Sequence, residues 1–301
     1  MKIRVALCTD ENFTIPALVC VTSLFETNRH NDCEVYILTD GLSDKATSKF
    51  RKLSEYYNQK VEICEINEHS LTTLITTDRY PKSMYFRFIL PEILHNINKV
   101  LYLDCDILVR HNLEDLFKIE LNNKACAVVE DQQSDDIQII NRLHIKFPYF
   151  NSGVMLMNLS YWRENNIAAK ILNFIGKNPT KCVYPDQDAL NVILDKDVIY
   201  LDYKYNYQEM WLTMRDYARI HFLKWKALDV AAKDPAIVHF CVDEKPWFIE
   251  CRNPFKNEYL QIANKHDFIG FKRKPKYRFI YTRLEAEIMR LRRWQKKFIN
   301  R

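Results

Sequence analysis

Apolar runs that end at polar residues alternate with helix-like patterns along most of this chain. Runs typical of buried strands occupy residues 3–8, 34–38, 61–66, 99–103, 125–129, 154–157 and 236–238. Apolar residues at helical spacing lie between them, over 16–26, 43–57, 83–94 and 185–194, with a short helix expected after Asn112. Such alternation predicts an α/β fold with a mostly parallel central sheet, covered on both faces and binding ligands beyond the carboxyl ends of its strands.

Two carboxylates follow one of the most apolar runs. Asp104 and Asp106 come directly after Leu101-Tyr102-Leu103. In an extended strand residues i and i+2 point to the same side, so both acids could share one ion. A divalent cation removes the repulsion between them, and Mg²⁺ or Mn²⁺ prefers such oxygens while keeping open positions for nucleotide phosphates. Because Asp-x-Asp is also common in surface turns and helix caps, the pair alone does not define a site.

Other acids follow other predicted strands, or open a predicted helix. Asp10 and Asp131 come after apolar runs, and Asp186 follows Pro185 at the start of a helical pattern. Each has a simpler explanation, as a turn residue, a loop acid and a helix cap respectively. Because strand ends of a parallel sheet meet at one edge, we expect these carboxylates to gather there.

A histidine and a glycine extend this candidate site. His239 follows a short apolar run, and Lys245 begins a Lys-Pro-Trp segment six residues later. A lone histidine at such a place is more often a core residue, but imidazole also suits Mn²⁺, and lysine is a point charge for phosphate. Gly153 is one of only four glycines and precedes a very apolar run. It indicates a bulge or a close approach of a ligand to the backbone.

Four segments together resemble glycosyltransferase family 8. They are Leu-Tyr-Leu-Asp-Cys-Asp at 101–106, Tyr-Phe-Asn-Ser-Gly-Val at 149–154, Asp-Gln-Asp-Ala-Leu-Asn at 186–191, and His239 with Lys-Pro-Trp at 245–247. Within the family the chain is most similar to bacterial lipooligosaccharide α-galactosyltransferases and their lipopolysaccharide relatives. The resemblance implies a glycosyltransferase A type (GT-A) fold, Mn²⁺ with Mg²⁺ as the alternative, and transfer of a hexose from a UDP-sugar with retention of configuration. Galactose is favoured over glucose, and the acceptor would be lipooligosaccharide, lipopolysaccharide or another cell-surface glycan.

The resemblance also implies roles for individual residues. The metal ligands would be Asp104, Asp106 and His239, with Asp104 also near the donor. Asp10 and Asn12 would hold uridine and ribose, Arg87 the donor sugar or its phosphate, and Lys245 the diphosphate. Asp131, Asn151 and Asp186 would orient sugar hydroxyls, and Gln187 would lie nearest the anomeric carbon, opposite the leaving UDP. One position departs from the family, because Val242 stands where members often have glycine.

Charge is distributed unevenly between the body and the C-terminal segment. Residues 271–301 contain twelve Lys or Arg and two Glu, a net charge of +10, which leaves −5 on residues 1–270. The basic residues alternate with aromatic and aliphatic ones, a pattern that fits an interfacial segment on an anionic membrane. Nucleic acid is the competing ligand for such a segment. We favour the membrane because the implied acceptor is a glycolipid, and a solvated tail is the third interpretation.

Length and composition set the remaining expectations. The 301 residues, 48% of them hydrophobic, can form one large domain or two modest ones, and we expect a catalytic domain at 1–250 and a basic region at 251–301. With no signal-peptide pattern and no apolar run of 18 residues, we expect a cytoplasmic protein, peripheral on the inner face of the cytoplasmic membrane. Nine scattered cysteines without a Cys-x-x-Cys pair predict reduced, mostly buried thiols.

Two other functions share some of these features. A sugar-nucleotide nucleotidyltransferase would have the same sheet and metal acids, but it usually carries a glycine-rich phosphate loop near the N-terminus, and residues 8–13 contain no glycine. A non-enzymatic basic protein that binds membranes or nucleic acid would not explain why Asp104, Asp106, His239 and Lys245 occur together.

Overall fold

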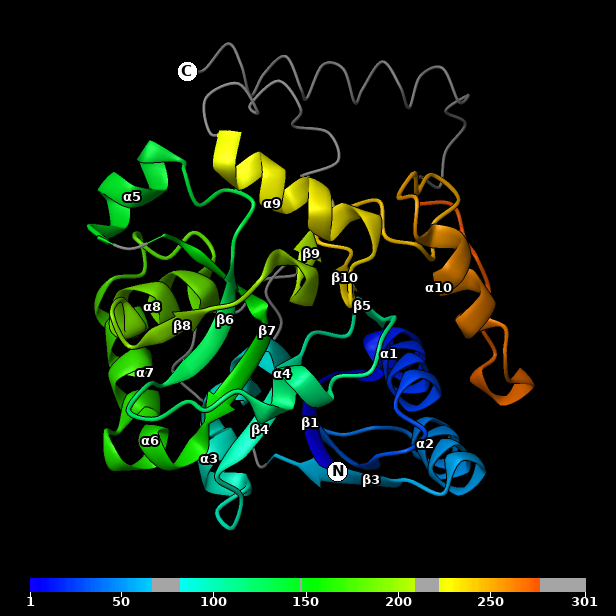
Figure 1. The fold of residues 1–301 in the computed structure, drawn as a ribbon. Helices are drawn as coiled ribbons and strands as arrows, with labels where there is room; N and C mark the ends of the chain where they lie inside the picture. Colours follow the sequence, from blue (N-terminus) through cyan, green and yellow to red (C-terminus); the bar gives the residue numbers. More distant parts are fainter. Residues whose placement is uncertain (67–81, 147, 209–221, 277–301) are drawn as a thin grey trace.

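A computed structural model describes residues 1–66, 82–146, 148–208 and 222–276, and its centre is a seven-stranded sheet (Figure 1). The strand order is β3-β2-β1-β4-β7-β6-β8. β7 runs antiparallel to both of its neighbours, and the other pairs in this sheet are parallel. The expected α/β fold with a mostly parallel sheet is confirmed. The strands are β1 (Lys2–Cys8), β2 (Asp32–Thr39), β3 (Lys60–Glu65), β4 (Lys99–Leu103), β6 (Cys126–Glu130), β7 (Phe150–Asn158) and β8 (Val198–Tyr200).

Helices cover both faces of this sheet, as its apolar strands require. In β1, Val5 and Leu7 pack into one core, whereas Ala6 and Cys8 pack into a second core on the opposite face. Figure 1 shows α1 and α2 on one side, and α6, α7 and α8 on the other. The first side has α1 (Thr14–Thr27), α2 (Asp44–Tyr57) and α4 (Glu114–Lys118), and the second has α3 (Leu90–Ile93), α6 (Leu159–Glu164), α7 (Ile167–Lys177) and α8 (Pro185–Leu194).

The helices begin close to the predicted positions, with two differences. Ser43 caps α2 by accepting a hydrogen bond from the Ala46 amide. The helix expected over 83–94 is a 3₁₀ helix, η3 (Lys82–Ile89), followed by the short α3. The helix-cap explanation of Asp186 is wrong, because Tyr184 is the N-cap residue of α8 and Asp186 lies inside its first turn. The Asp186 carboxylate is therefore directed to another partner.

A small second sheet lies at the edge where β1 and β4 end. Its order is β5 (Ile107–Val109), β10 (Ile237–His239) and β9 (Tyr207–Gln208). β10 runs antiparallel to β5 with His239 opposite Ile107, and the Phe240 amide donates to the Asp106 carbonyl at 3.0 Å. This register brings a histidine from far along the chain beside the acids that follow β4.

The chain beyond residue 250 continues into the same core. Tyr259 and Ala263 of α10 (Lys256–Ala263), together with Ile269, are buried in the cluster that contains Val5. The remaining elements are α5 (Ile137–Leu143), α9 (Phe222–Lys233), η1 (Glu11–Phe13), η4 (Tyr203–Tyr205) and η7 (Asp267–Ile269).

No disulfide joins any of the nine cysteines in the structure, and seven of them are buried, which confirms that they are mostly buried residues. Within the described ranges, no helix combines the length and the apolar character needed to cross a membrane.

Candidate active site

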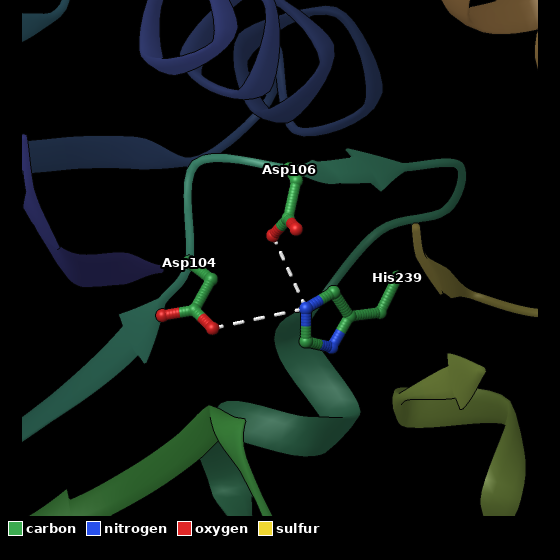
Figure 2. A group of neighbouring side chains, drawn as sticks. All are labelled: Asp104, Asp106 and His239. Atoms are coloured by element: carbon green, nitrogen blue, oxygen red, sulfur yellow. Dashed lines mark ion pairs between the residues drawn. The ribbon is translucent and has the colours of Figure 1, made fainter. Parts of the chain in front are cut away.

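Asp104, Asp106 and His239 converge where β4 ends (Figure 2). The backbone does not stay extended between the acids, because β4 ends at Leu103 and the chain turns at Cys105. The turn still directs both carboxylates to one imidazole nitrogen. His239 Nε2 lies 3.1 Å from Asp106 Oδ1 and 3.7 Å from Asp104 Oδ2. The extended-strand explanation of the pair is therefore wrong, whereas the grouping with His239 is present.

Each carboxylate has one oxygen facing His239 and the other held by a cation. Arg87 Nη2 contacts Asp104 Oδ1 at 3.1 Å, and Lys245 Nζ contacts Asp106 Oδ2. Burial would raise the pKa of Asp106, but the positive charges of Lys245 and His239 outweigh it and the pKa is lowered. Each carboxylate thus has one oxygen bound to a cationic side chain and the other directed toward His239.

Gly153 provides the space for this group. A Cβ atom at this position would lie 2.2 Å from His239 Cε1 and 2.6 Å from Asp104 Oδ2. The Gly153 carbonyl also accepts a hydrogen bond from the Asp104 amide at 2.8 Å. The pairing register of β6 with β7 shifts between Val128 and Val129, opposite this segment. Gly153 therefore lies beside a bulge, as one of its two explanations predicted, and it is closely approached by protein side chains.

Arg87 is buried and joins several parts of the site. Its guanidinium donates to the carbonyls of Met84 and Ser152, contacts Asp186 Oδ2 at 3.3 Å, and lies over the Tyr102 ring. Burial raises the pKa of Asp186, although the nearby Arg87 charge opposes this. Arg87 therefore places Asp186 beside Asp104, from different elements of the chain.

Asp131, Asn151 and Gln187 form a second group, linked to the first through Ser152. Asn151 Nδ2 and Gln187 Nε2 donate to Asp131 Oδ2 at 3.0 and 3.2 Å. Gln187 Oε1 accepts from the Ser152 amide at 2.9 Å, and the Ser152 carbonyl accepts from Arg87. Burial raises the pKa of Asp131, and the hydrogen bonds from Asn151 and Gln187 oppose this. Because β7 runs antiparallel to β4 and β6, the first residues of β7 lie at the edge where the parallel strands end.

The segment with Asp10 and Asn12 lies next to the Lys-Pro-Trp segment. Asp10 follows β1 and caps η1 by accepting from the Phe13 amide at 3.0 Å, and Asn12 is exposed in η1. The Phe13 and Trp247 rings meet edge to face with centroids 5.9 Å apart. This contact connects the two segments.

Residues 271–276 hold the Lys-Pro-Trp segment from its other side. The Ile249 amide donates to the Lys274 carbonyl, and the Lys274 amide donates to the Trp247 carbonyl, at 3.1 and 3.2 Å. Arg273 donates to the Phe248 carbonyl at 2.9 Å. The start of the basic C-terminal segment therefore belongs to the architecture around Lys245.

The donor set fits a hard divalent cation. Two carboxylates and one imidazole offer ligand atoms that lie within 4.8 Å of one another. Oxygen ligands with one imidazole suit Mn²⁺ and Mg²⁺, and they leave further positions for phosphate oxygens.

Comparison with known proteins identifies the family. The sequence matches Glycosyl transferase family 8 over residues 4–251, so the chain belongs to that family. General stress protein A of Bacillus subtilis is 27% identical over 87% of this chain and 93% of its own. Lipopolysaccharide glucosyltransferase WaaO of Escherichia coli is 27% identical over 92% of this chain and 86% of its own.

Solved structures confirm the fold. The crystal structure of galactosyltransferase LgtC with donor and acceptor sugar analogues superposes with a TM-score of 0.79 and 22% identity, covering 88% of this chain and 96% of that one. The predicted GT-A fold and the predicted glycosyltransferase class are confirmed. Family membership decides against the nucleotidyltransferase and against a protein without enzymatic activity.

Sequence reasoning did not single out several residues of this site. Asn206, between η4 and β9, is fully buried and contacts both Asn151 and His239. The backbone amide of Ser152 donates to Gln187 Oε1, and the hydroxyl of Tyr102 donates to Asp104 Oδ1. The only signal for Asn206 is a polar residue between Tyr205 and Tyr207, which is too common to indicate a site.

The space at Gly153 yields a first prediction. Gly153→Ala should weaken Mn²⁺ binding at least about tenfold, comparable to other changes that displace metal ligands, because the new methyl group must displace His239 or Asp104. Isothermal titration with Mn²⁺ measures the effect. Gly176→Ala is the matched control, since its Cβ would meet nothing within 4 Å, and alanine is favoured over glycine in a helix. Unchanged affinity in a folded Gly153→Ala variant would contradict the proposed crowding.

Proposed function

We propose that this protein transfers a hexose from a UDP-hexose to a glycan acceptor, with retention of anomeric configuration and with a divalent cation. The observation that carries the proposal is the convergence of Asp104, Asp106 and His239 beside Lys245 in a family 8 chain. Mn²⁺ is the cation we favour, with Mg²⁺ as the alternative, because the ligand set includes one imidazole.

We assign the donor site to the residues around this group. Asp10 and Asn12 would bind uridine and ribose, since the Phe13–Trp247 contact brings their segment next to the Lys-Pro-Trp segment at 245–247, called the lysine segment below. Lys245 would neutralise the diphosphate, and Arg87 would act at the donor sugar or its phosphate. Asp131, Asn151 and Asp186 would orient the sugar hydroxyls. Val242, in place of the glycine common in the family, would reduce the backbone's access to the diphosphate.

The proposed reaction is a substitution on one face of the sugar. The acceptor hydroxyl oxygen bonds to the anomeric carbon while the bond from that carbon to the β-phosphate oxygen breaks, and its electron pair leaves with UDP. The hydroxyl proton passes to the departing phosphate oxygen. A bound cation would neutralise charge on that phosphate, and Lys245 would add to this effect.

Residue chemistry favours this course over a double displacement. The residue assigned to the face opposite UDP is Gln187, whose amide is a poor nucleophile. Both ends of this amide are engaged, with Asp131 at one end and Ser152 at the other. Asp186 is held by Arg87.

For the donor sugar we favour galactose, with glucose second, and for the acceptor a lipooligosaccharide, lipopolysaccharide or other cell-surface glycan. LgtC is described as a galactosyltransferase and WaaO as a lipopolysaccharide glucosyltransferase. We further propose that the basic segment 271–301 places the enzyme on an anionic membrane at the inner face of the cytoplasmic membrane, where a glycolipid acceptor would be found. Nucleic acid is the disfavoured ligand. Residues 277–301 lie outside the described residues.

Donor hydrolysis measured with UDP-galactose, UDP-glucose and other UDP-sugars tests the activity and its metal requirement. We expect Mn²⁺-dependent release of UDP, greatest with UDP-galactose. Asp106→Asn should lower it at least about 100-fold, because losing a ligand should cost no less than losing an outer partner, typically 10–100-fold. Asp115→Asn, whose side chain is 88% exposed on α4, should match the wild type. Wild-type turnover by Asp106→Asn would overturn the metal assignment.

Trapping experiments test the one-face substitution. With a slow fluorinated donor and no acceptor, mass spectrometry of the intact protein should find no glycosyl adduct. A hexose attached to Gln187 or Asp186 in the peptide map would instead establish a double displacement.

Truncation separates the membrane segment from the active site. Removal of 277–301 should abolish binding to vesicles that contain phosphatidylglycerol, and should spare donor hydrolysis. Removal of 271–301 should also raise the KM for the donor severalfold, because it removes the contacts of Lys274 and Arg273 with the lysine segment. Phosphatidylcholine vesicles are the control for charge. Vesicle binding that persists without 277–301 would refute the membrane role.

A further inference from the structure

The hydrogen bonds behind His239 run in one direction through two amide side chains, Asn206 and Asn151. The backbone amide of Gly153 can only donate, and it donates to one side-chain atom of Asn151 at 3.0 Å. That atom must therefore be the carbonyl oxygen Oδ1. The other end of this side chain is the NH₂ group, which donates to Asp131 Oδ2 at 3.0 Å. Asn151 thus has a single orientation.

The same reasoning orients the next residue. Asn206 approaches Asn151 Oδ1 at 2.9 Å, so the approaching atom must be the Asn206 NH₂ group. Asn206 Oδ1 is then the atom that lies 3.1 Å from His239 Nδ1. A carbonyl oxygen only accepts, so His239 Nδ1 must carry a hydrogen. His239 is positively charged beside Asp106 when no ion is bound. When Nε2 releases its proton so that it can bind a cation, Nδ1 keeps its hydrogen, and the Nε2 lone pair faces the space between the two carboxylates.

Burial and strand pairing both restrict the position of Asn206. It is fully buried, and it directly precedes β9, which pairs in parallel with β10 so that Gln208 lies opposite His239. Gln208 also fixes the chain before and after Asp131, because its Nε2 donates to the Glu130 carbonyl and its Oε1 accepts from the Gln132 amide. The network is therefore anchored at the strand that carries the histidine and at the loop that carries Asp131.

We propose that Asn206 is a positioning residue that selects the metal-binding tautomer of His239, through the network Asp131–Asn151–Asn206–His239. Histidine ligands of metals commonly donate their second ring N–H to an outer partner, and losing such partners typically lowers metal affinity 10–100-fold. Here the outer partner is the Asn206 side chain. The Gly153 amide, acting through Asn151, fixes which end of the Asn206 side chain faces His239. The inference rests on the proposed metal site, but it concerns how the protein prepares that site.

Mn²⁺ titration of the full chain, followed by the electron paramagnetic resonance signal of free Mn²⁺, tests this role without an activity assay. Asn206→Leu removes the acceptor and should raise the Kd for Mn²⁺ about 10–100-fold. Asn206→Asp keeps an acceptor for Nδ1–H but places its second oxygen against Asn151 Oδ1, so it should restore only part of the affinity. Asn28→Leu is the matched control, because Asn28 is equally buried and bonds to Leu24 and Leu113, far from this network. It should leave the Kd unchanged.

The outcomes separate this inference from the proposed function. Unchanged affinity in Asn206→Leu, with loss of binding in His239→Ala, overturns the role of Asn206 and leaves the metal site intact. Failure of the wild type to bind Mn²⁺ refutes the metal site itself. If Asn206→Leu does not fold, ¹⁵N NMR of the wild type saturated with diamagnetic Mg²⁺ decides. A proton on Nδ1 of His239 supports the proposal, and a bare or metal-bound Nδ1 overturns it.

Discussion

The approach of two carboxylates to one buried imidazole is the constraint on which the rest of this site depends. Two acids this close repel each other, and in a partly buried place the repulsion is weakly screened. A cationic side chain offsets this repulsion at each acid. Arg87 binds the outer oxygen of Asp104, and Lys245 binds the outer oxygen of Asp106. The inner oxygens face His239 and remain available to an ion. The positive charges of Arg87 and Lys245 thus reduce the repulsion between the acids, and neither side chain lies between the inner oxygens.

The fold brings these groups together through changes in strand direction. Parallel strands alone would deliver Asp10, Asp104 and Asp131 to one edge. The antiparallel β7 also delivers its first residues there, so that Asn151, Ser152 and Gly153 lie among the acids. The antiparallel pairing of β5 with β10 adds His239. Each reversal places a residue at the site that a purely parallel sheet would place at the opposite edge.

The sequence predicted most strands of the central sheet and the helices α1, α2, α4 and α8, because their signals are local, but it did not single out β8, α5, α6, α7, α9 or α10. The strand and helix positions follow from apolar periodicity, and Ser43 and Pro185 mark helix starts. The repeated occurrence of acids after predicted strands also indicated that these acids lie at one edge of the sheet. The family resemblance added His239 as a metal ligand. The turn at Cys105 was not predicted, because nothing in Asp-Cys-Asp distinguishes a turn from a continuing strand. Asn206 was not predicted either, because its importance lies in contacts with Asn151 and His239, 55 and 33 residues away.

The start of the basic segment illustrates why charge alone does not delimit a functional region. Composition separates residues 271–301 from the body, yet residues 271–276 are bound to the lysine segment by backbone hydrogen bonds that carry no sequence signature. Lys276 also lies 3.7 Å from Asp243 and 3.9 Å from Glu244, beside the lysine segment. These two acids directly follow Val242, the residue that stands where the resemblance leads one to expect glycine, and they lie opposite a basic residue of the segment. The departure at Val242-Asp243-Glu244 and the basic segment are therefore parts of one local arrangement, in which the loop after His239 is held by contacts with the C-terminal segment.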